Sequence, residues 1–332
     1  MKFDKAPTSR DVALLAGVSQ STVSRAFSPK ANLAPETRQR VMEAAKVLNY
    51  QPNALARGLV MSQSNIIAVV KGYTRNSIFS DILSEIVYLL QQADKRVIYF
   101  EAKENESIDD LANKIMRYQI QGLVLLYVDL ASDLTAYCQQ RQIPVLQIHR
   151  HSISVTTNAV LPDNYKAAGE AAELFIKKGY KNFAYLAGTI DSSTNMERQL
   201  GFQKVLQEHG CDAPLILQGD YTYESGMEAM RNAVPKLSLP IAVLSSNDLM
   251  AYGAIDVLKY EYDLRIGKDV AIVGFDNLPM GQWPSYRLTS FAQPIPQMAK
   301  EGIEILFENM KDKSMNPVER RYPLTLIERD SV

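Results

Sequence analysis

Hydrophobic positions divide the chain into a short helical region and a long region in which strands and helices alternate. The first sixty residues contain no strand-like run. Apolar residues there recur at helical spacing, as at Val41, Ala44, Ala45 and Leu48, and this spacing predicts one face of an amphipathic helix. From Asn65 onward, short β-rich runs alternate with amphipathic stretches. This second pattern predicts parallel sheets built from α/β units.

The strand-like runs are short, and amphipathic stretches separate many of them. Helical spacing is clearest at 82–90 and 167–177. About 270 residues in this pattern exceed what a single sheet normally takes, so we expect two lobes. The expected strands are 66–70, 97–100, 123–128, 145–148, 183–186, 242–244, 270–273 and 324–327.

The segment 8–27 has the pattern of a helix-turn-helix. Gly17 provides a residue that tolerates positive φ at the turn, and Ala13 is small enough for two helices to cross closely. Ser19 is a suitable N-cap for the second helix. Pro35 then favours the first turn of a third helix. The helical region is therefore predicted to fold as a small unit with its own core.

The second of these helices would expose side chains that suit the reading of DNA bases. Gln20 and Ser21 lie at its N-terminal end, which enters the major groove in helix-turn-helix proteins. Arginine pairs bidentately with guanine and glutamine with adenine, so Arg25 and Gln20 fit base recognition. An ordinary helical hairpin with polar surface residues is the alternative.

Charge is distributed unevenly along the chain. The complete sequence has a net charge of −1, but the residues before Ser62 carry nine bases and four acids, or +5, and the remainder carries −6. A basic unit on an acidic body indicates that only the first unit meets a polyanion. Cys138 and Cys211 have no metal-ligand spacing, so we expect reduced thiols in a cytoplasmic protein. We find no secretion signal and no apolar run near the ~20 residues that a membrane span needs.

A set of short motifs runs through the first sixty residues. They are Asp11-Val12-Ala13, Ala16-Gly17-Val18-Ser19, Thr22-Val23-Ser24-Arg25, Glu36-Thr37-Arg38, Leu48-Asn49-Tyr50, Pro52-Asn53, Ala56-Arg57 and Leu59. These motifs resemble the lactose-repressor/galactose-repressor (LacI/GalR) family of bacterial regulators, and the resemblance covers nearly the whole chain. It implies a sequence-specific DNA-binding transcriptional regulator, usually a repressor, whose operator affinity a small effector controls allosterically. It implies no enzymatic activity and no cofactor.

The resemblance also implies the fold class. We expect a small all-α helix-turn-helix head and an α/β effector domain of two Rossmann-like lobes with parallel sheets, similar to periplasmic-binding proteins. The head would take residues 1–52, a hinge helix or linker 53–62, and the effector and dimerisation domain 63–332. The N-lobe would comprise about 63–162 and 293–322, and the C-lobe about 163–292 and 323–332.

Family members contact DNA through the head and through the segment that follows it. Leu59 matches a leucine that wedges into the minor groove, where it unstacks base steps at a cost of a few kcal/mol. Because so short a helix is marginal alone, we hypothesise that 53–60 orders only on DNA. Ala34 replaces the serine or threonine that commonly caps the third helix, a loss that typically costs ~1 kcal/mol. The DNA-binding residues that the resemblance implies are Thr8, Ser19, Gln20, Ser21, Thr22, Ser24, Arg25, Asn53, Ala56 and Leu59.

Polar residues follow several of the expected strands, and ligands bind at the carboxyl ends of strands in open α/β sheets. The effector-lining residues that the resemblance implies are Phe79, Arg150, Asp163, Arg198, Asn247, Asp276 and Gln293. Carboxylates and amides suit sugar hydroxyls, while two arginines equally suit a phosphate or a carboxylate. We therefore expect a sugar, sugar acid or sugar phosphate. Asp248 is interpreted as a helix cap. Trp283 is interpreted as a packing residue, with a ring that covers the effector as its alternative.

The expected partners are a pseudo-palindromic double-stranded operator, the small effector and a second copy of the chain. No leucine heptad follows Val332, so we expect a homodimer rather than a tetramer, and no membrane contact. Ser77 and Lys71 lie near positions where the family usually has prolines. The identity of the effector therefore stays open, as do its action as inducer or corepressor and the operator sequence.

Two other classes of protein compete with this interpretation. An enzyme would use His149-Arg150-His151 as a metal-binding pair with Asp163, but only three histidines occur and no phosphate loop or nucleophile elbow accompanies them. We therefore predict no metal site and no catalytic residue, and we expect solvent or loop histidines. A solute-binding protein would need a secretion signal and no DNA-binding head.

Overall fold

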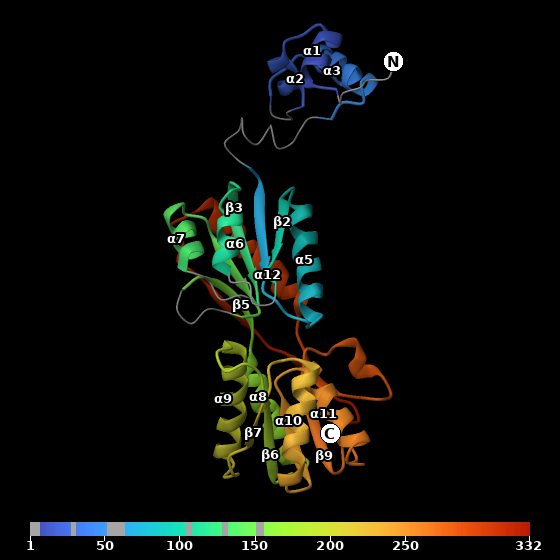
Figure 1. The fold of residues 1–332 in the computed structure, drawn as a ribbon. Helices are drawn as coiled ribbons and strands as arrows, with labels where there is room; N and C mark the ends of the chain where they lie inside the picture. Colours follow the sequence, from blue (N-terminus) through green and yellow to red (C-terminus); the bar gives the residue numbers. More distant parts are fainter. Residues whose placement is uncertain (1–6, 28–30, 52–63, 104–107, 128–131, 151–155) are drawn as a thin grey trace. The chain divides into compact units, whose positions relative to one another are not determined.

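The computed structural model describes residues 7–27, 31–51, 64–103, 108–127, 132–150 and 156–332. The chain divides into two compact units, 1–64 and 65–332, coloured from dark blue to red in Figure 1. Each unit has its own hydrophobic core. None of the helices in the described ranges is long and apolar enough to cross a membrane.

In the part of the first unit that the structure describes, there are three short helices whose ends follow from local sequence. Thr8 and Asp11 form a capping box at the start of the first helix. Gly17 ends that helix with φ of 65°, and Ser19 caps the next one by accepting from the Thr22 amide. The predicted helix-turn-helix is therefore confirmed. The helices are α1 (Ser9–Ala16), α2 (Gln20–Ala26) and α3 (Pro35–Val47).

The core of this unit is small and depends on close helix crossings. Val12 and Val41 are fully buried, and Val23 is 1% exposed. The N-cap position of α3, Ala34, makes no side-chain cap, as its sequence predicts. Arg38 on α3 instead donates to the carbonyl oxygens of Ala26 and Ala31, the second at 2.9 Å. This guanidinium fastens the end of α2 to α3.

The N-lobe of the second unit is built on a six-stranded sheet of order β11-β5-β4-β3-β1-β2. Every neighbouring pair in it is parallel. Its strands are β1 (Ile66–Lys71), β2 (Arg96–Glu101), β3 (Ile120–Leu126), β4 (Val145–Ile148), β5 (Asn158–Pro162) and β11 (Glu319–Tyr322). Its helices are α5 (Ile78–Gln92), α6 (Ile108–Ile115), α7 (Ser132–Gln140) and α12 (Ile295–Lys311).

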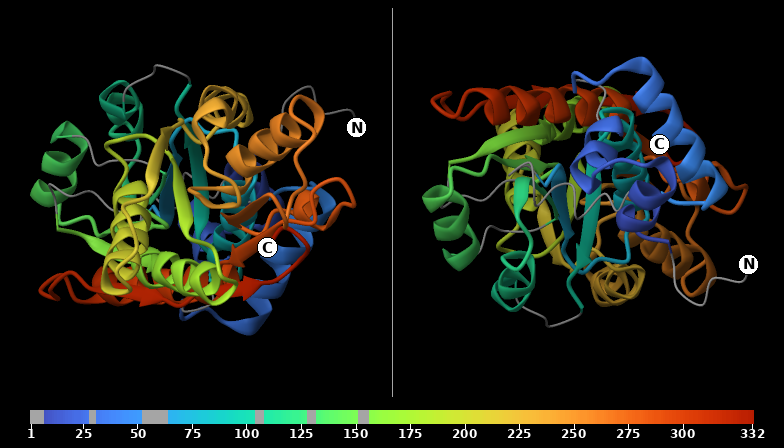
Figure 2. Two further views of the ribbon diagram at one scale, coloured as in Figure 1. Left: turned by 90° about the horizontal axis from the view of Figure 1, so that it is seen from below. Right: turned by 90° about the horizontal axis from the view of Figure 1, so that it is seen from above.

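Strand β1 shows how this sheet is covered on both faces. Its side chains alternate between two clusters, because successive side chains of a strand point to opposite faces. Ile67 and Val69 pack with residues of α5 and α12, whereas Ala68 and Val70 pack with residues of α6 and α7. Helix α12, in red, lies beside α5 along one face of the sheet (Figure 2). A continuous apolar run is therefore the expected sequence for such a strand.

The C-lobe repeats this architecture with a six-stranded sheet of order β12-β10-β9-β8-β6-β7. Only its β10–β12 pair is antiparallel among the paired strands described. The strands are β6 (Asn182–Ala187), β7 (Leu215–Gln218), β8 (Ile241–Ser245), β9 (Val270–Phe275), β10 (Thr289–Ala292) and β12 (Thr325–Ile327). The helices are α8 (Asn164–Lys177), α9 (Ser193–Glu208), α10 (Tyr223–Ala233), α11 (Asp248–Tyr260), η1 (Val234–Lys236) and η2 (Pro279–Gln282).

The chain passes between the two lobes after β5, after β10 and after β11, so each sheet is completed by a distant segment. The passage after β10 contains Gln293, and the passage after β5 contains Asp163. Residues that follow the parallel strands of each lobe are thereby brought to the junction between the lobes. This junction is where an open α/β sheet binds ligands.

Candidate DNA-binding surface and effector cleft

Helix α2 presents polar side chains on its exposed face. Gln20 and Arg25 are both exposed. Gln20 Nε2 donates to Ser9 Oγ at 2.7 Å, and the hydroxyls of Ser19 and Ser21 lie 2.8 Å apart. Within the described ranges, no hydrogen bond or ion pair engages Arg25. The Arg25 guanidinium therefore keeps all its donors available to another molecule.

The remaining predicted DNA-contact residues have different environments. The Thr8 hydroxyl donates to Asp11 in the capping box, and the Thr22 hydroxyl lies 2.8 Å from that of Ser19. Ser24 is exposed. Asn53, Ala56 and Leu59 lie outside the described residues, and so does the segment 53–60 for which folding on DNA was hypothesised.

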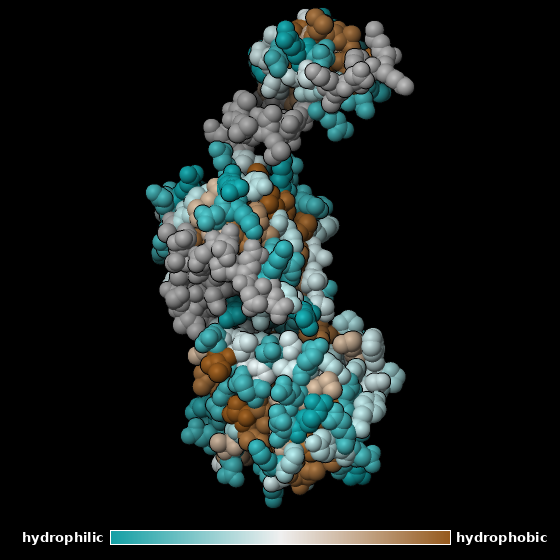
Figure 3. Space-filling view, viewed as in Figure 1, coloured by the Kyte–Doolittle hydropathy of each residue, from teal (hydrophilic) through white to brown (hydrophobic). Residues whose placement is uncertain are grey.

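Apolar side chains also reach the surface of the first unit. Leu14 is 85% exposed and Leu15 is 53% exposed, although both belong to the apolar run of α1. Val12, Ala13 and Ala16 of that run are buried. Figure 3 shows this apolar surface in brown over α1. The small core of the unit therefore leaves out the two leucines of the run.

Between the two lobes of the second unit lies a small void of about 20 Å³. Such a void holds a single water molecule, whereas ligand pockets normally measure several hundred Å³. Its walls come from loops and helices that follow strands of both lobes. The lining residues are Thr74, Asn76, Phe79, Tyr127, His149, Thr194, Arg198, Tyr221, Asn247 and Asp276. Four of the seven predicted effector residues are thus brought together: Phe79, Arg198, Asn247 and Asp276.

Asp276 is the centre of a hydrogen-bond network that joins the lobes. It follows β9 with φ of 103°, and its side chain is buried. Its carboxylate accepts from Asn76 Nδ2 at 2.7 Å and from Gln293 Nε2 at 2.8 Å. Burial raises the pKa of Asp276, while the charge of Arg198 and these two hydrogen bonds act in the opposite direction. Gln293, a fifth predicted residue, therefore touches the site through Asp276.

Arg198 is a fully buried cation on α9, 1% exposed. Its Nε donates to Asn164 Oδ1 at 2.9 Å, and its Nη1 donates to the carbonyl oxygen of Ser246. The guanidinium lies 3.9 Å from the ring centroid of Phe275. Its Nη2 has no hydrogen-bond partner among the described residues. Buried cations need compensation, so this unpaired donor on a residue that lines the void makes Arg198 a candidate for ligand binding.

The other two predicted effector residues lie outside the void. Arg150 places its guanidinium 5.5 Å from the ring of Tyr127 and donates to the carbonyl oxygen of Asp191 at 3.2 Å. Asp163 caps α8 by accepting from the Lys166 amide at 3.2 Å. Its neighbour Asn164, which holds Arg198, is the residue of this pair that supports the site.

His149 was expected to be a solvent or loop histidine; it does lie in the loop after β4, but it is not exposed to solvent. It follows β4 with φ of 76°, is 6% exposed and lines the void. Its ring packs edge-on against Phe79, with centroids 4.8 Å apart. Burial, together with the charges of Arg198 and Arg150, lowers the pKa of His149 to about 3. The ring is therefore neutral.

The structure corrects two further expectations beside the site. The cap of α11 is Asn247, whose side chain accepts from the Met250 amide at 3.0 Å. Asp248 is instead the first helical residue, fully buried, where it accepts from the Leu278 amide at 2.8 Å. Trp283 is 53% exposed, so it is not a core packing residue, and it does not line the void.

Sequence reasoning missed several lining residues: Thr74, Asn76, Tyr127, Thr194 and Tyr221. Tyr127 immediately follows the end of β3, a position that the strand pattern alone could have identified. Tyr221 has φ of 72° and donates to Ser192 at 2.9 Å. No local sequence signal marks it, because its position depends on Gly188: a Cβ there would meet the Tyr221 ring at 2.2 Å.

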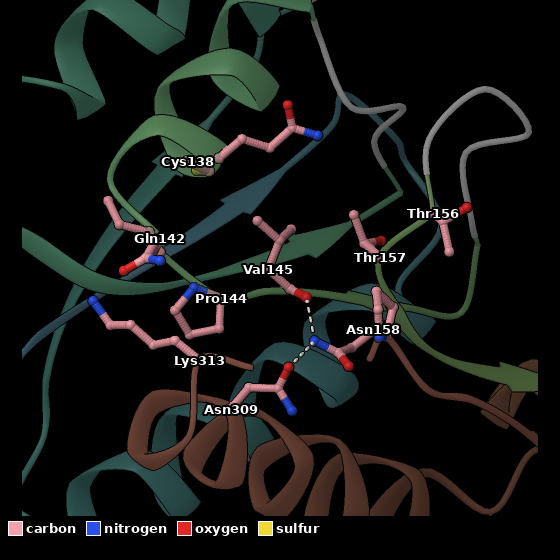
Figure 4. Close-up of a pocket in the computed structure, with 12 residues that line it drawn as sticks. Cys138, Gln142, Pro144, Val145, Thr156, Thr157, Asn158, Asn309 and Lys313 are labelled. Atoms are coloured by element: carbon pink, nitrogen blue, oxygen red, sulfur yellow. Dashed lines mark hydrogen bonds between the residues drawn. The ribbon is translucent and has the colours of Figure 1, made fainter. Parts of the chain in front are cut away.

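A larger cavity of about 320 Å³ lies in the N-lobe, at the ends where β4 and β5 begin (Figure 4). Here Asn158 Nδ2 donates to the Val145 carbonyl oxygen and to Asn309 Oδ1, both at 3.1 Å. These two hydrogen bonds connect β5 to β4 and to α12. No buried charged pair lines this cavity. The void between the lobes is smaller, but its lining includes two buried charged side chains, Arg198 and Asp276.

A helix-turn-helix unit joined to a two-lobed α/β body with a polar cleft defines a DNA-binding transcription regulator. Residues 8–53 match the model for bacterial regulatory proteins of the lacI family, and residues 172–332 match that for periplasmic binding protein-like domains. The chain belongs to the LacI family of transcriptional regulators, which are not enzymes.

Full-length relatives support this membership. The HTH-type transcriptional repressor CytR of Escherichia coli (strain K12) is 29% identical and covers 99% of this chain and 97% of its own. Catabolite control protein A of Priestia megaterium is 27% identical over 92% and 93% of the two chains. A crystal structure of the lac repressor dimer bound to operator and an anti-inducer is 25% identical, with a TM-score of 0.88 over 98% and 99% of the two chains.

Proposed function

We propose that this chain is a cytoplasmic homodimeric repressor that binds a pseudo-palindromic operator, and that a small effector between its lobes controls operator affinity. Among the similar proteins, the lac repressor was solved as a dimer bound to its operator, and CytR is a transcriptional repressor. One helix-turn-helix contacts too few base pairs to select a site in a genome. Two copies about one helical turn apart supply the missing selectivity.

The DNA-binding half of the proposal rests on α2. Its first residues, Gln20 and Ser21, stand at the end of a recognition helix that enters the major groove. Arg25, one turn later, is exposed and offers a planar donor fork that fits guanine. Thr8, Ser19, Thr22 and Ser24 surround these readers and suit phosphate or base-edge contacts. Asn53, Ala56 and the wedge residue Leu59 stay predictions from the sequence.

The observation that carries the effector half is the buried pair of Arg198 and Asp276 between the lobes. A buried cation and a buried carboxylate are costly unless a ligand or a partner compensates them. Carboxylate, amide and guanidinium groups in one cleft suit a sugar or a sugar derivative. A relative of known structure, the regulator CelR, is solved as a complex with cellobiose and has a TM-score of 0.73 to this chain.

Coupling between effector binding and DNA binding follows from which residues meet at the cleft. Asn76 and His149 belong to the N-lobe, whereas Asp276 and Arg198 belong to the C-lobe. A ligand that replaces contacts between these groups favours one closure angle over another. In a dimer, a change of closure angle alters the spacing of the two heads and hence the operator affinity.

Selection of duplexes from a random pool, followed by binding titrations, tests the proposal. We expect the selected sites to be pseudo-palindromes that bind two chains with a steep inverse dependence on salt. A screen of sugars, sugar acids and sugar phosphates should then yield a ligand that changes this affinity and raises the melting temperature of the protein. Asymmetric sites bound by one chain, or operator affinity that no cleft ligand changes, would contradict it.

A further inference from the structure

The side chains around Asp276 fix the position of a proton on His149. Gln293 Nε2 lies 2.8 Å from Asp276 Oδ1 and 3.0 Å from His149 Nε2. Both oxygens of Asp276 receive an amide donor, one from Gln293 and one from Asn76. The opposite orientation of the Gln293 amide would set its oxygen against a carboxylate oxygen, so the nitrogen must face Asp276.

An amide nitrogen carries two hydrogens, and both are then assigned. One is donated to Asp276 and the other points to His149 Nε2, which must accept it. The neutral ring of His149 therefore carries its proton on Nδ1. That nitrogen has no hydrogen-bond partner among the described residues, and neither has Arg198 Nη2. Both residues line the void and both are more than nine-tenths buried.

Two buried donors without acceptors thus belong to residues that line the same small void, one from each lobe. His149 follows β4 in the N-lobe, and Arg198 belongs to α9 in the C-lobe. Leaving a buried donor unpaired costs free energy, and the cost is larger for a charged donor. A neutral polyol meets this need poorly because each hydroxyl also brings a hydrogen that needs an acceptor. A carboxylate accepts only, and its two oxygens suit two separate donors.

The charges around the void agree with a single negative charge on the ligand. Its lining residues carry one cation, Arg198, and one anion, Asp276. These two charges balance each other, so a ligand with a single negative charge adds less buried negative charge beside Asp276 than a doubly charged phosphate would.

We propose that the effector is a monoanionic sugar acid whose carboxylate binds His149 Nδ1 and Arg198 Nη2, so that His149 selects acids over neutral sugars. This inference rests on the effector-controlled function proposed above and names the ligand class of that same cleft. Gln293 Oε1, a buried acceptor without a partner, is then available to a hydroxyl of the ligand.

Residue 149 offers a matched pair of variants. Its φ of 76° lies in the left-handed region, which asparagine and aspartate tolerate better than most residues. In His149→Asn the side-chain nitrogen takes the place of Nδ1 and keeps a donor there. In His149→Asp a negatively charged acceptor occupies the same place. The two variants have nearly the same shape, so a difference between them reports the donor and not the fold.

The experiment is calorimetric titration of the dimeric full-length chain. The ligands are the common hexuronates and hexonates, the neutral hexoses and hexitols of the same configuration, and glucose 6-phosphate. We expect at least one acid to bind more than about tenfold tighter than its neutral counterpart and than the phosphate. His149→Asn should keep that affinity within a few fold. His149→Asp should lose at least about tenfold for the acid and little for the neutral sugar.

Three outcomes would overturn the inference. If a neutral sugar or the phosphate binds tighter than every acid, and the binding needs Arg198, the effector-controlled function stands and the acid preference is wrong. If His149→Asp binds the acid as well as the wild type, His149 does not hold the carboxylate. If no ligand of the series binds, the sugar-acid inference is wrong, and the sugar effector of the proposed function is lost with it.

Discussion

Asn76 and Asp276 are 200 positions apart in sequence, yet Asn76 Nδ2 donates to Asp276 Oδ2 across the cleft at 2.7 Å. The bond places an amide of the N-lobe where a ligand hydroxyl would sit on a C-lobe carboxylate. Together with the contact of Gln293 to both Asp276 and His149, it holds the lobes closed over a void of about 20 Å³. If the effector binds as proposed, it must displace Asn76 before it can reach Asp276.

Removal of this hydrogen bond should loosen the cleft. Asn76→Ala deletes the donor and leaves one oxygen of a buried carboxylate unpaired, at a cost of about 1–3 kcal/mol in the free energy of unfolding. Amide exchange of residues 74–79 and 275–277 should become faster. Asn182→Ala is the control, because Asn182 donates to the Pro240 carbonyl oxygen at 3.2 Å within one lobe. Equal exchange in the two variants would show that the Asn76 bond does not keep the lobes closed.

Low pH should destabilise the two-lobed unit through the titration of His149. The folded-state pKa of His149 is about 3, below its ordinary value of 6.5, because burial disfavours the charged ring. Between these values the unfolded chain binds more protons, so stability is complete above pH 6.5 and falls as pH decreases toward 3, by at most about 1.4 kcal/mol per pH unit. The buried carboxyl of Asp276, with its raised pKa, acts in the opposite direction.

The His149→Asn variant isolates this contribution, because asparagine does not titrate. Urea unfolding of both proteins at pH 4, 5, 6 and 7 should give a smaller dependence on pH for the variant. If the free energy of unfolding depends on pH equally in the two proteins, His149 is not the group that titrates.

The first unit should gain stability from a single added cap. Ala34 is the N-cap of α3, has an extended backbone and makes no side-chain hydrogen bond to the helix. In Ala34→Ser the hydroxyl can accept from the amides of Glu36 or Thr37, which should stabilise this unit by about 0.5–2 kcal/mol. Thermal unfolding and amide exchange at the start of α3 measure the gain. Ala34→Gly should give at most a few tenths of a kcal/mol, and an equal effect of both variants would rule out capping.

Elements with strong local signals could be predicted from the sequence. The turn at Gly17, the cap at Ser19 and the start of α3 at Pro35 depend on neighbouring residues only, and the structure confirms them. All eight expected strands overlap observed ones. Strands such as β1, β8 and β9 were predicted because buried parallel strands form apolar runs.

Four strands escaped prediction, and the reasons differ. β7 and β11 are four-residue strands at sheet edges. β11 reads Glu-Arg-Arg-Tyr and has no apolar run, whereas β7 reads Leu-Ile-Leu-Gln and is apolar but short. β5 and β10 are short and begin with polar residues, Asn158 in β5 and Thr289 in β10. Their pairing is set by contacts with strands far away in sequence, which no local pattern contains.

The cleft could be predicted only in part, for a similar reason. Arg198, Asn247 and Asp276 stand in recognisable motifs, and all three line the void. His149 looked like a loop residue because its burial depends on Phe79 and Gln293, which come from other segments. Asn76 gave no signal at all, since its partner is Asp276 in the other lobe.

The most direct test of the account is the effect of Arg25→Ala on operator binding, with Arg40→Ala as the control. Both residues are exposed arginines of the first unit, on α2 and α3, so both variants lose one positive charge. Binding of each protein to the selected operator and to random duplex is measured by fluorescence anisotropy at one salt concentration. We expect Arg25→Ala to weaken operator binding at least about tenfold more than random binding, whereas Arg40→Ala should weaken both alike. Equal losses on operator and random DNA in both variants would contradict base reading by α2.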